Sequence, residues 1–126
     1  MNVLFSIKPR FVKEIVNGRK KYEFRKAVPK NKAIKNVYIY SSAPTQMIVA
    51  KFTPGQITCD TPEKLWSKFG EWAGIDKDEF FGYFQGKETG FAIAINDLDV
   101  FEKPVDPRLL RENFTPPQSF CYVGEI

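Results

Sequence analysis

Within the first 18 residues, a mostly apolar run is followed by apolar residues at helical spacing. Residues 2–7 form a short, mostly apolar run that predicts a strand. Pro9 then suits the first turn of a helix, because its missing N–H would have no partner there. Gly18 supplies a left-handed stop to that helix. The apolar stripe between them recurs at helical spacing and consists of Phe11, Val12, Ile15 and Val16.

Alternation of charged and aromatic side chains follows at residues 21–26 and predicts a half-buried strand. It places Lys21, Glu23 and Arg25 on one face. Strict alternation would put Lys20 on the opposite face, so either the strand begins at Lys21 or a bulge intervenes. Pro54 predicts a bend. The other strands are expected at 37–40, 47–52, 89–96, 99–103 and 120–123.

Two helices are expected between the middle strands and the apolar run at 89–96. Thr61 and Asp76 are the predicted N-caps, and Glu79 stands three residues after Asp76 as in a capping box. The aromatic residues of this region are expected to form core. We therefore predict an α+β fold, a small mixed β-barrel of about six strands, with a crossover helix after the first strand and a helical pair before the late central strand.

The length of 126 residues suits a single domain, 1–126, and 43% apolar residues can supply its core. No apolar run is long enough to span a membrane, and the N-terminus is too short for a signal peptide, so we expect a cytoplasmic protein without a membrane partner. The chain has no histidine, and Cys59 and Cys121 are expected to be reduced. Neither a metal nor a cofactor is therefore expected, and any chemistry must use Lys, carboxylate, Ser/Thr, Tyr or Cys.

Charge is distributed unevenly along the chain. Residues 1–35 carry eleven Lys or Arg against two Glu, a balance of +9, whereas the remaining 91 residues carry −5. A local positive field of this size attracts polyanions such as RNA. The alternative is a solvated, lysine-rich face that only keeps the protein soluble.

The segment Gly18–Arg25 has the form G-x-K-x-x-E-x-R at the junction of helix and strand. It resembles the signature of the ASCH domain, a branch of the PUA-like superfamily. The segments 4–9 and 116–120 resemble a small prokaryotic subgroup of that family, so the similarity runs from about residue 3 to residue 123. The resemblance implies a PUA-like β-barrel with a cleft beside the first helix, where RNA, a nucleoside or a nucleotide is expected to bind.

Arg25 offers a planar fork for a phosphate or a guanine edge, and Glu23 can accept a proton from a base amino group. The alternative is a surface ladder of ion pairs, and Gln118 and Ser119 could equally be ordinary turn residues. If Arg25 lies in the cleft, Arg25→Ala should weaken binding more than Lys32→Ala. The residues expected to bind are Lys8, Gly18, Lys20, Lys21, Glu23, Arg25, Lys26, Gln118 and Ser119.

Some ASCH proteins are amidohydrolases of N4-acylated cytidines such as N4-acetylcytidine, with a lysine, a threonine and a glutamate. The resemblance places Lys20 at the lysine, Glu23 at the threonine and Glu71 at the glutamate. A carboxylate cannot replace the nucleophilic hydroxyl, and Glu23 should keep Lys20 protonated. The main interpretation is therefore an RNA or modified-nucleobase binding module, in RNA processing or transcription regulation. A hydrolase of a nucleoside or nucleic acid, in which Glu23 or Glu71 activates water, and a protein-interaction module remain alternatives.

Overall fold

The computed structural model describes residues 1–30 and 33–126. Lys32, which belongs to the basic N-terminal segment, lies outside the described residues. The strands are β1 (Asn2–Ile7), β2 (Tyr22–Arg25), β3 (Asn36–Ser41), β4 (Met47–Asp60), β5 (Gly90–Val105) and β6 (Phe120–Val123). The helices are α1 (Pro9–Val16), α2 (Pro62–Phe69) and α3 (Lys77–Tyr83), with short 3-10 turns η1 (Gly70–Trp72) and η2 (Pro107–Leu109).

The strands form one mixed sheet in the order β2-β5-β4-β3-β1-β6. β1 and β3 are parallel, and α1 lies on the connection between them, which confirms the crossover helix. The other neighbours are antiparallel. α2 and α3 lie between β4 and β5, as expected for the helical pair.

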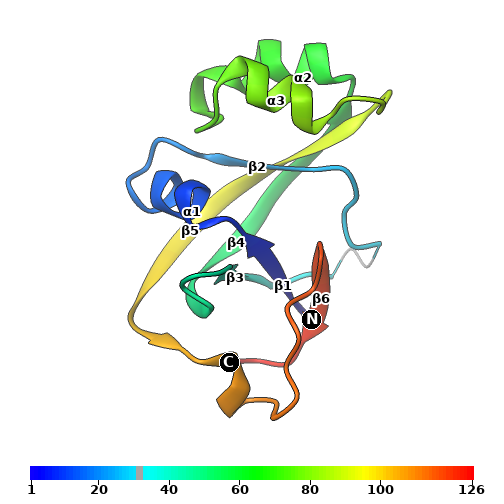
Figure 1. Ribbon diagram of the computed structural model, residues 1–126. Helices are drawn as coiled ribbons and strands as arrows, with labels where there is room; N and C mark the ends of the chain where they lie inside the picture. The colour runs from blue at the N-terminus through cyan, green and yellow to red at the C-terminus, as the bar shows by residue number, and fades with distance from the viewer. Residues whose placement is uncertain (31–32) are drawn as a thin grey trace.

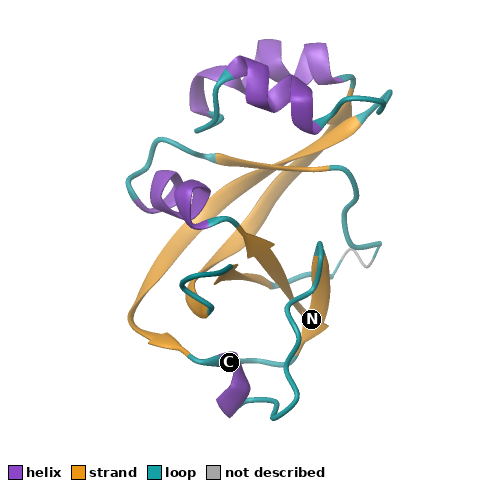
Figure 2. Ribbon diagram, in the orientation of Figure 1, coloured by secondary structure: helices purple, strands orange, loops and turns teal. Residues whose placement is uncertain are grey.

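The expected barrel closure is wrong, because β2 and β6 are the two edges of an open sheet. Each edge strand has only four residues, and each pairs with one neighbour. What joins the two edges in the described chain is a side-chain contact from Arg25 to Ser119. The long connection that leads into β6 contains only η2 and loop (Figure 2).

β4 and β5 are the long elements of the fold, and they extend from the helical pair to the opposite end of the molecule (Figure 1). β4 does not end at Pro54, where a bend was expected. It continues to Asp60 through a register shift against β5 between Pro54 and Ile57. β5 likewise includes the predicted continuation at 99–103.

The predicted caps of α2 and α3 are confirmed. Thr61 Oγ1 accepts a hydrogen bond from the Lys64 amide, and Asp76 Oδ1 accepts one from the Glu79 amide. Both helices pack through aromatic rings onto β2 and β5, where Phe80 contacts Phe24 edge to face at 5.0 Å. Phe80 and Phe84 are therefore core, with Trp66, Phe69 and Phe81 packed against them, whereas Trp72, which was also expected to be core, and Tyr83 of the same region are each 38% exposed. The buried rings fix the helical pair above β2.

Both cysteines carry free thiols; Cys59 is exposed and Cys121 is partly buried. In the described chain, no helix has the length and apolar character needed to cross a membrane.

Candidate functional site

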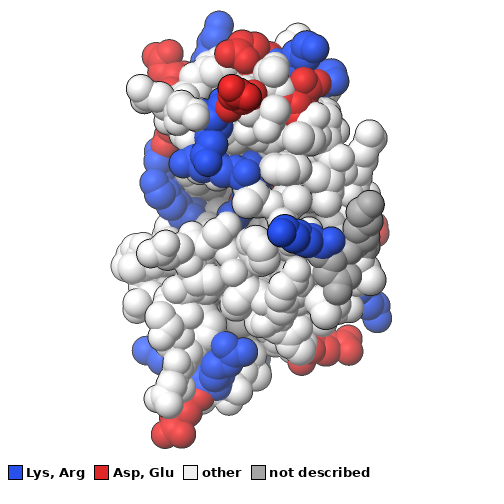
Figure 3. All heavy atoms as spheres, turned by 90° about the vertical axis from the view of Figure 1, so that its right-hand side faces the viewer, with Lys and Arg blue, Asp and Glu red and all other residues white. Residues whose placement is uncertain are grey.

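A cleft of about 790 Å³ opens between α1, β2, α3 and the segment that leads into β6. Lys and Arg side chains gather around a hollow below the helical pair on the face shown in Figure 3. An ion pair between Arg10 of α1 and Glu79 of α3 joins two walls of the cleft. The cleft therefore lies where the first helix meets the helical pair, beside the G-x-K-x-x-E-x-R segment.

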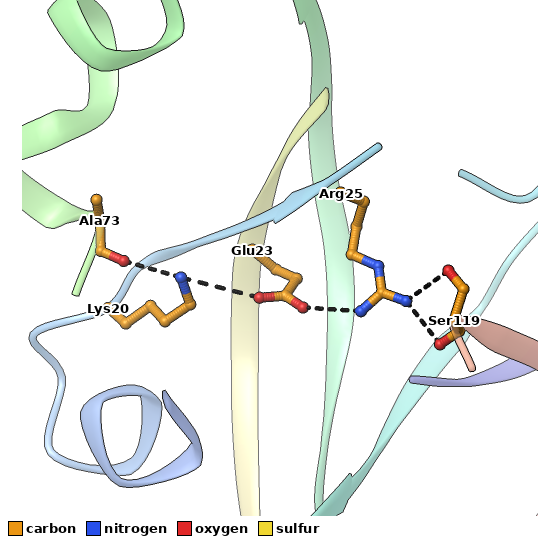
Figure 4. Close-up of polar contacts among 5 residues, drawn as sticks. All are labelled: Lys20, Glu23, Arg25, Ala73 and Ser119. Atoms are coloured by element: carbon orange, nitrogen blue, oxygen red, sulfur yellow. Dashed lines mark hydrogen bonds and ion pairs between the residues drawn. The ribbon is translucent and has the colours of Figure 1, made fainter. Parts of the chain in front are cut away.

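Three charged residues of that segment form one buried row along the cleft: Lys20, Glu23 and Arg25 (Figure 4). Lys20 Nζ lies 3.8 Å from Glu23 Oε1, and Arg25 Nη1 lies 3.2 Å from Glu23 Oε2. Their side chains are only 4–8% exposed. With Lys20 protonated, the row has two cations and one carboxylate, so it presents a positive field to the cleft.

The position of Lys20 follows from where β2 begins. β2 starts at Tyr22, so strand alternation does not apply to Lys20, and its side chain can lie on the same side as Glu23. The turn before β2 is held by two backbone hydrogen bonds, from the Lys20 amide to Glu14 and from the Lys21 amide to Trp72, both 2.9 Å. The question left open by the sequence is thus answered by a late strand start, without a bulge at this position.

Lys20 is held in a strongly desolvating environment. Its Nζ donates to the Ala73 carbonyl at 2.8 Å and lies 5.0 Å from the centre of the Phe24 ring. Burial lowers the pKa of Lys20, and the nearby Glu23 carboxylate opposes this only in part. Glu23 therefore raises the pKa of Lys20, as expected, but burial lowers it by more, so the net shift is downward.

Arg25 is fixed from three directions. Nη1 donates to Glu23, while Nη2 donates to both the carbonyl and Oγ of Ser119. Its guanidinium carbon lies 4.4 Å from the centre of the Phe5 ring. Nε is buried and has no hydrogen-bond partner among the described residues. A guanidinium held in this way is suited to bind a phosphate or a carboxylate.

Tyr83 lies at the rim of the cleft and was not predicted as a site residue. Lys26 Nζ lies 4.7 Å from the centre of its ring, and the residue is 38% exposed. Burial raises the pKa of Tyr83, so its hydroxyl stays protonated at neutral pH and can donate a proton or hydrogen bond. One sequence signal could have indicated its position: Tyr83 stands three residues after Phe80, so the two side chains are neighbours on the surface of the same predicted helix.

The structure brings most of the expected binding residues to the cleft, namely Lys8, Lys20, Glu23, Arg25, Lys26, Gln118 and Ser119. Gly18 and Lys21 are exposed and are not part of its lining. Glu71 is exposed on η1 and also lies outside the lining, so the structure does not place it with Lys20 and Glu23. Gly18 does have the left-handed backbone expected of it, with φ of 83°.

Within residues 1–30 and 33–126, no group of three or more Asp, Glu or Cys side chains is arranged so that it could hold a metal ion. The cleft lining offers the buried Lys20, Glu23 and Arg25, together with the carboxylate of Glu79, the hydroxyls of Ser6 and Ser119 and the phenol of Tyr83.

Comparison with known proteins adds four similarities. The model of a family described as "Domain of unknown function (DUF365)" matches residues 1–112. An "ASCH domain-containing ribonuclease" of Zymomonas mobilis is 29% identical over 126 residues, covering 95% of this chain and 82% of that protein. The crystal structure of ASCH from Zymomonas mobilis superposes with a TM-score of 0.90 at 28% identity, covering 98% and 88% of the two chains. Large ribosomal subunit protein uL22 of Ureaplasma parvum is 28% identical over 101 residues, which span 79% of this chain but only 32% of that protein.

Proposed function

Since this chain is an ASCH domain protein and belongs to the DUF365 family, we propose that it is a ribonuclease that cleaves RNA in the cleft carrying the buried row. The observation that carries the proposal is the row itself. A lysine with a lowered pKa lies beside a carboxylate and a fixed arginine, in a cleft of nucleotide size. The relative from Zymomonas mobilis, described as a ribonuclease, favours RNA hydrolysis over binding alone.

The row supplies groups that cleavage of an RNA phosphodiester needs. Lys20, whose pKa is lowered, takes the proton of the attacking 2′-hydroxyl in its neutral form. The 2′-oxygen bonds to phosphorus, and the bond from phosphorus to the 5′-oxygen breaks. Arg25 stabilises the negative charge that develops on the phosphoryl oxygens. Tyr83, which remains protonated, donates its proton to the leaving 5′-oxygen.

Glu23 has a positioning role in this scheme. Its two oxygens lie between Lys20 and Arg25, so it fixes the spacing of the base and the phosphate-binding group. It also limits how far the pKa of Lys20 falls, because its negative charge favours the ammonium form.

The test is cleavage of a fluorescent single-stranded RNA oligonucleotide, followed by denaturing electrophoresis and mass spectrometry of the products. We expect cleavage by the wild type, and a loss of roughly 100-fold or more in Lys20→Met. Lys87→Ala is the matched control, because Lys87 is exposed and outside the cleft lining. An oligonucleotide with 2′-deoxyribose at every position should resist cleavage, since it lacks the attacking hydroxyl.

Two other outcomes would replace the proposal. RNA that binds with steep salt dependence but is never cleaved would make this a binding module. Release of cytidine from N4-acetylcytidine, with RNA left intact, would make it an amidohydrolase that works without the threonine.

A further inference from the structure

A second cavity, here called the side groove, lies next to the cleft and has a volume of about 670 Å³. Its walls come from β1, β3, β4, β5 and the connection that follows β2. Lys26 and Ala27 line both the side groove and the cleft, so the two spaces share one wall. An extended ligand could therefore pass from one to the other over this short stretch of chain.

The lining of the side groove is apolar: Phe5 is fully buried at its base, while the rings of Pro54 and Phe91 are partly exposed. Ile57 adds an exposed apolar side chain, of which 46% is accessible to solvent. Flat rings of this kind form stacking surfaces for nucleobases, because every base has an apolar face.

Among the residues that the structure describes, Lys26 and Lys30 are the charged members of the side-groove lining, and no carboxylate belongs to it. An apolar space with a purely cationic edge is complementary to a ligand that combines a flat apolar part with an anionic part. A nucleotide has this composition, with its base on the apolar wall and its phosphate beside a lysine.

The backbone of β4 offers hydrogen-bonding groups at the same place. In the described chain, β4 pairs with β3 only from Met47 to Phe52, so its later residues have β5 as their only strand neighbour. Gly55, which lines the side groove, also falls within the register shift against β5. Edge backbone of this kind can bind polar groups of a ligand, as it does when a strand is added to a sheet.

We propose that the side groove is a second nucleotide subsite, which binds the nucleotide next to the one held in the cleft on the same RNA strand. The preferred substrate is then single-stranded RNA longer than a dinucleotide, since a duplex would keep its bases away from the apolar wall. This inference rests on the proposed RNA function of the cleft.

The experiment compares kcat/KM for a tetranucleotide with kcat/KM for a dinucleoside monophosphate. Ile57→Glu places a carboxylate in the side groove, and Lys30→Glu reverses a charge that lies in the side groove but not in the cleft lining. Val100→Glu is the matched control, because Val100 is also 46% exposed on a strand and lies outside both cavities. We expect the ratio of the two kcat/KM values to fall about tenfold in each groove variant and to stay at the wild-type value in the control.

If both groove variants fold and cleave RNA with an unchanged ratio, the side groove is not a nucleotide subsite, and the proposed ribonuclease function still stands. If the wild type cleaves no RNA, fluorescence anisotropy with a 2′-O-methyl tetranucleotide decides the question. A loss of affinity in Ile57→Glu and Lys30→Glu, but not in Val100→Glu, then supports the side groove as an RNA subsite although cleavage has failed. Equal affinity in all proteins overturns it.

Discussion

Arg25 Nη2 donates to the carbonyl oxygen of Ser119 at 2.6 Å and to its hydroxyl at 2.7 Å. Arg25 ends one edge strand of the sheet, and Ser119 directly precedes the other edge strand, so these two bonds join the edges that the backbone leaves apart (Figure 4). The same guanidinium also binds Glu23 and lines the cleft. One side chain therefore serves both the closure of the fold and the electrostatics of the site.

Arg25→Lys should weaken both roles although it keeps the charge. A lysine ammonium is a point charge and cannot bind Glu23 and Ser119 in the planar geometry of the guanidinium. We expect the free energy of unfolding in urea to fall by about 2 kcal/mol, and kcat/KM for RNA to fall by roughly tenfold or more. Ser119→Ala should cost less stability, because the carbonyl contact remains. Wild-type stability in Arg25→Lys would contradict the role of this side chain in joining the edges.

Gly74→Ala should displace Lys20. A Cβ atom at Gly74 would lie 2.4 Å from Lys20 Cβ and 3.0 Å from its Cα, and φ at this glycine is +62°. We expect a loss of about 2 kcal/mol in unfolding free energy together with reduced RNA cleavage. Gly18→Ala is the control, since its φ is +83° but its Cβ would have no atom within 4 Å. Equal effects of the two substitutions would mean that only backbone strain matters here.

The lowered pKa of Lys20 should appear in the pH dependence of stability. The folded state releases the Lys20 proton more readily than the unfolded chain, whose pKa is near 10.5. The unfolded state thus binds more protons between the lowered pKa and 10.5, and stability rises with pH across that window. Lys20→Met cannot titrate. The wild-type minus Lys20→Met difference in unfolding free energy, measured by urea denaturation, should therefore increase with pH up to about 10.5. A flat or falling difference would contradict the dominance of burial.

Glu23→Gln should lower both the stability of the protein and its rate of RNA cleavage, but should not weaken RNA binding. The substitution leaves the buried cations Lys20 and Arg25 without their carboxylate, and we expect a loss of about 3 kcal/mol in unfolding free energy. The more positive row should bind a non-cleavable 2′-O-methyl oligonucleotide at least as tightly as the wild type, as measured by anisotropy. RNA cleavage should nevertheless decrease, because Lys20 and Arg25 lose the group that fixes their spacing. Weaker binding would indicate that Glu23 contacts the RNA directly.

Much of the local structure could be predicted from residue types and spacing. The apolar spacing of α1 correctly indicated Phe11, Val12 and Ile15, although Val16 is 45% exposed, and the caps at Thr61 and Asp76 are contacts three residues apart. The grouping of Glu23 with Arg25 followed from strand alternation. These features are local, so a single chain read from end to end contains their causes.

The features that were missed depend on distant partners. Closure of the sheet would require β2 and β6 to pair with each other, and no local pattern encodes whether they do. The environment of Lys20 includes the Ala73 carbonyl, which lies 53 positions along the chain, as well as the Phe24 ring, which is close in sequence. Glu71 was placed by a resemblance across a region of uncertain spacing, and the structure has it on the surface.

A peptide spanning 18–25 would contain the whole buried row and none of the tertiary contacts that hold it. The Lys20–Ala73 bond joins residues 53 positions apart, and the Arg25–Ser119 bonds join residues 94 positions apart. Contacts of such separation close large loops and form late when a chain refolds. The segment before β6 must therefore pack before Arg25 is immobilised. A chain released from the ribosome without its last ten residues would lack both Ser119 contacts, which would leave Arg25 mobile and more exposed to water.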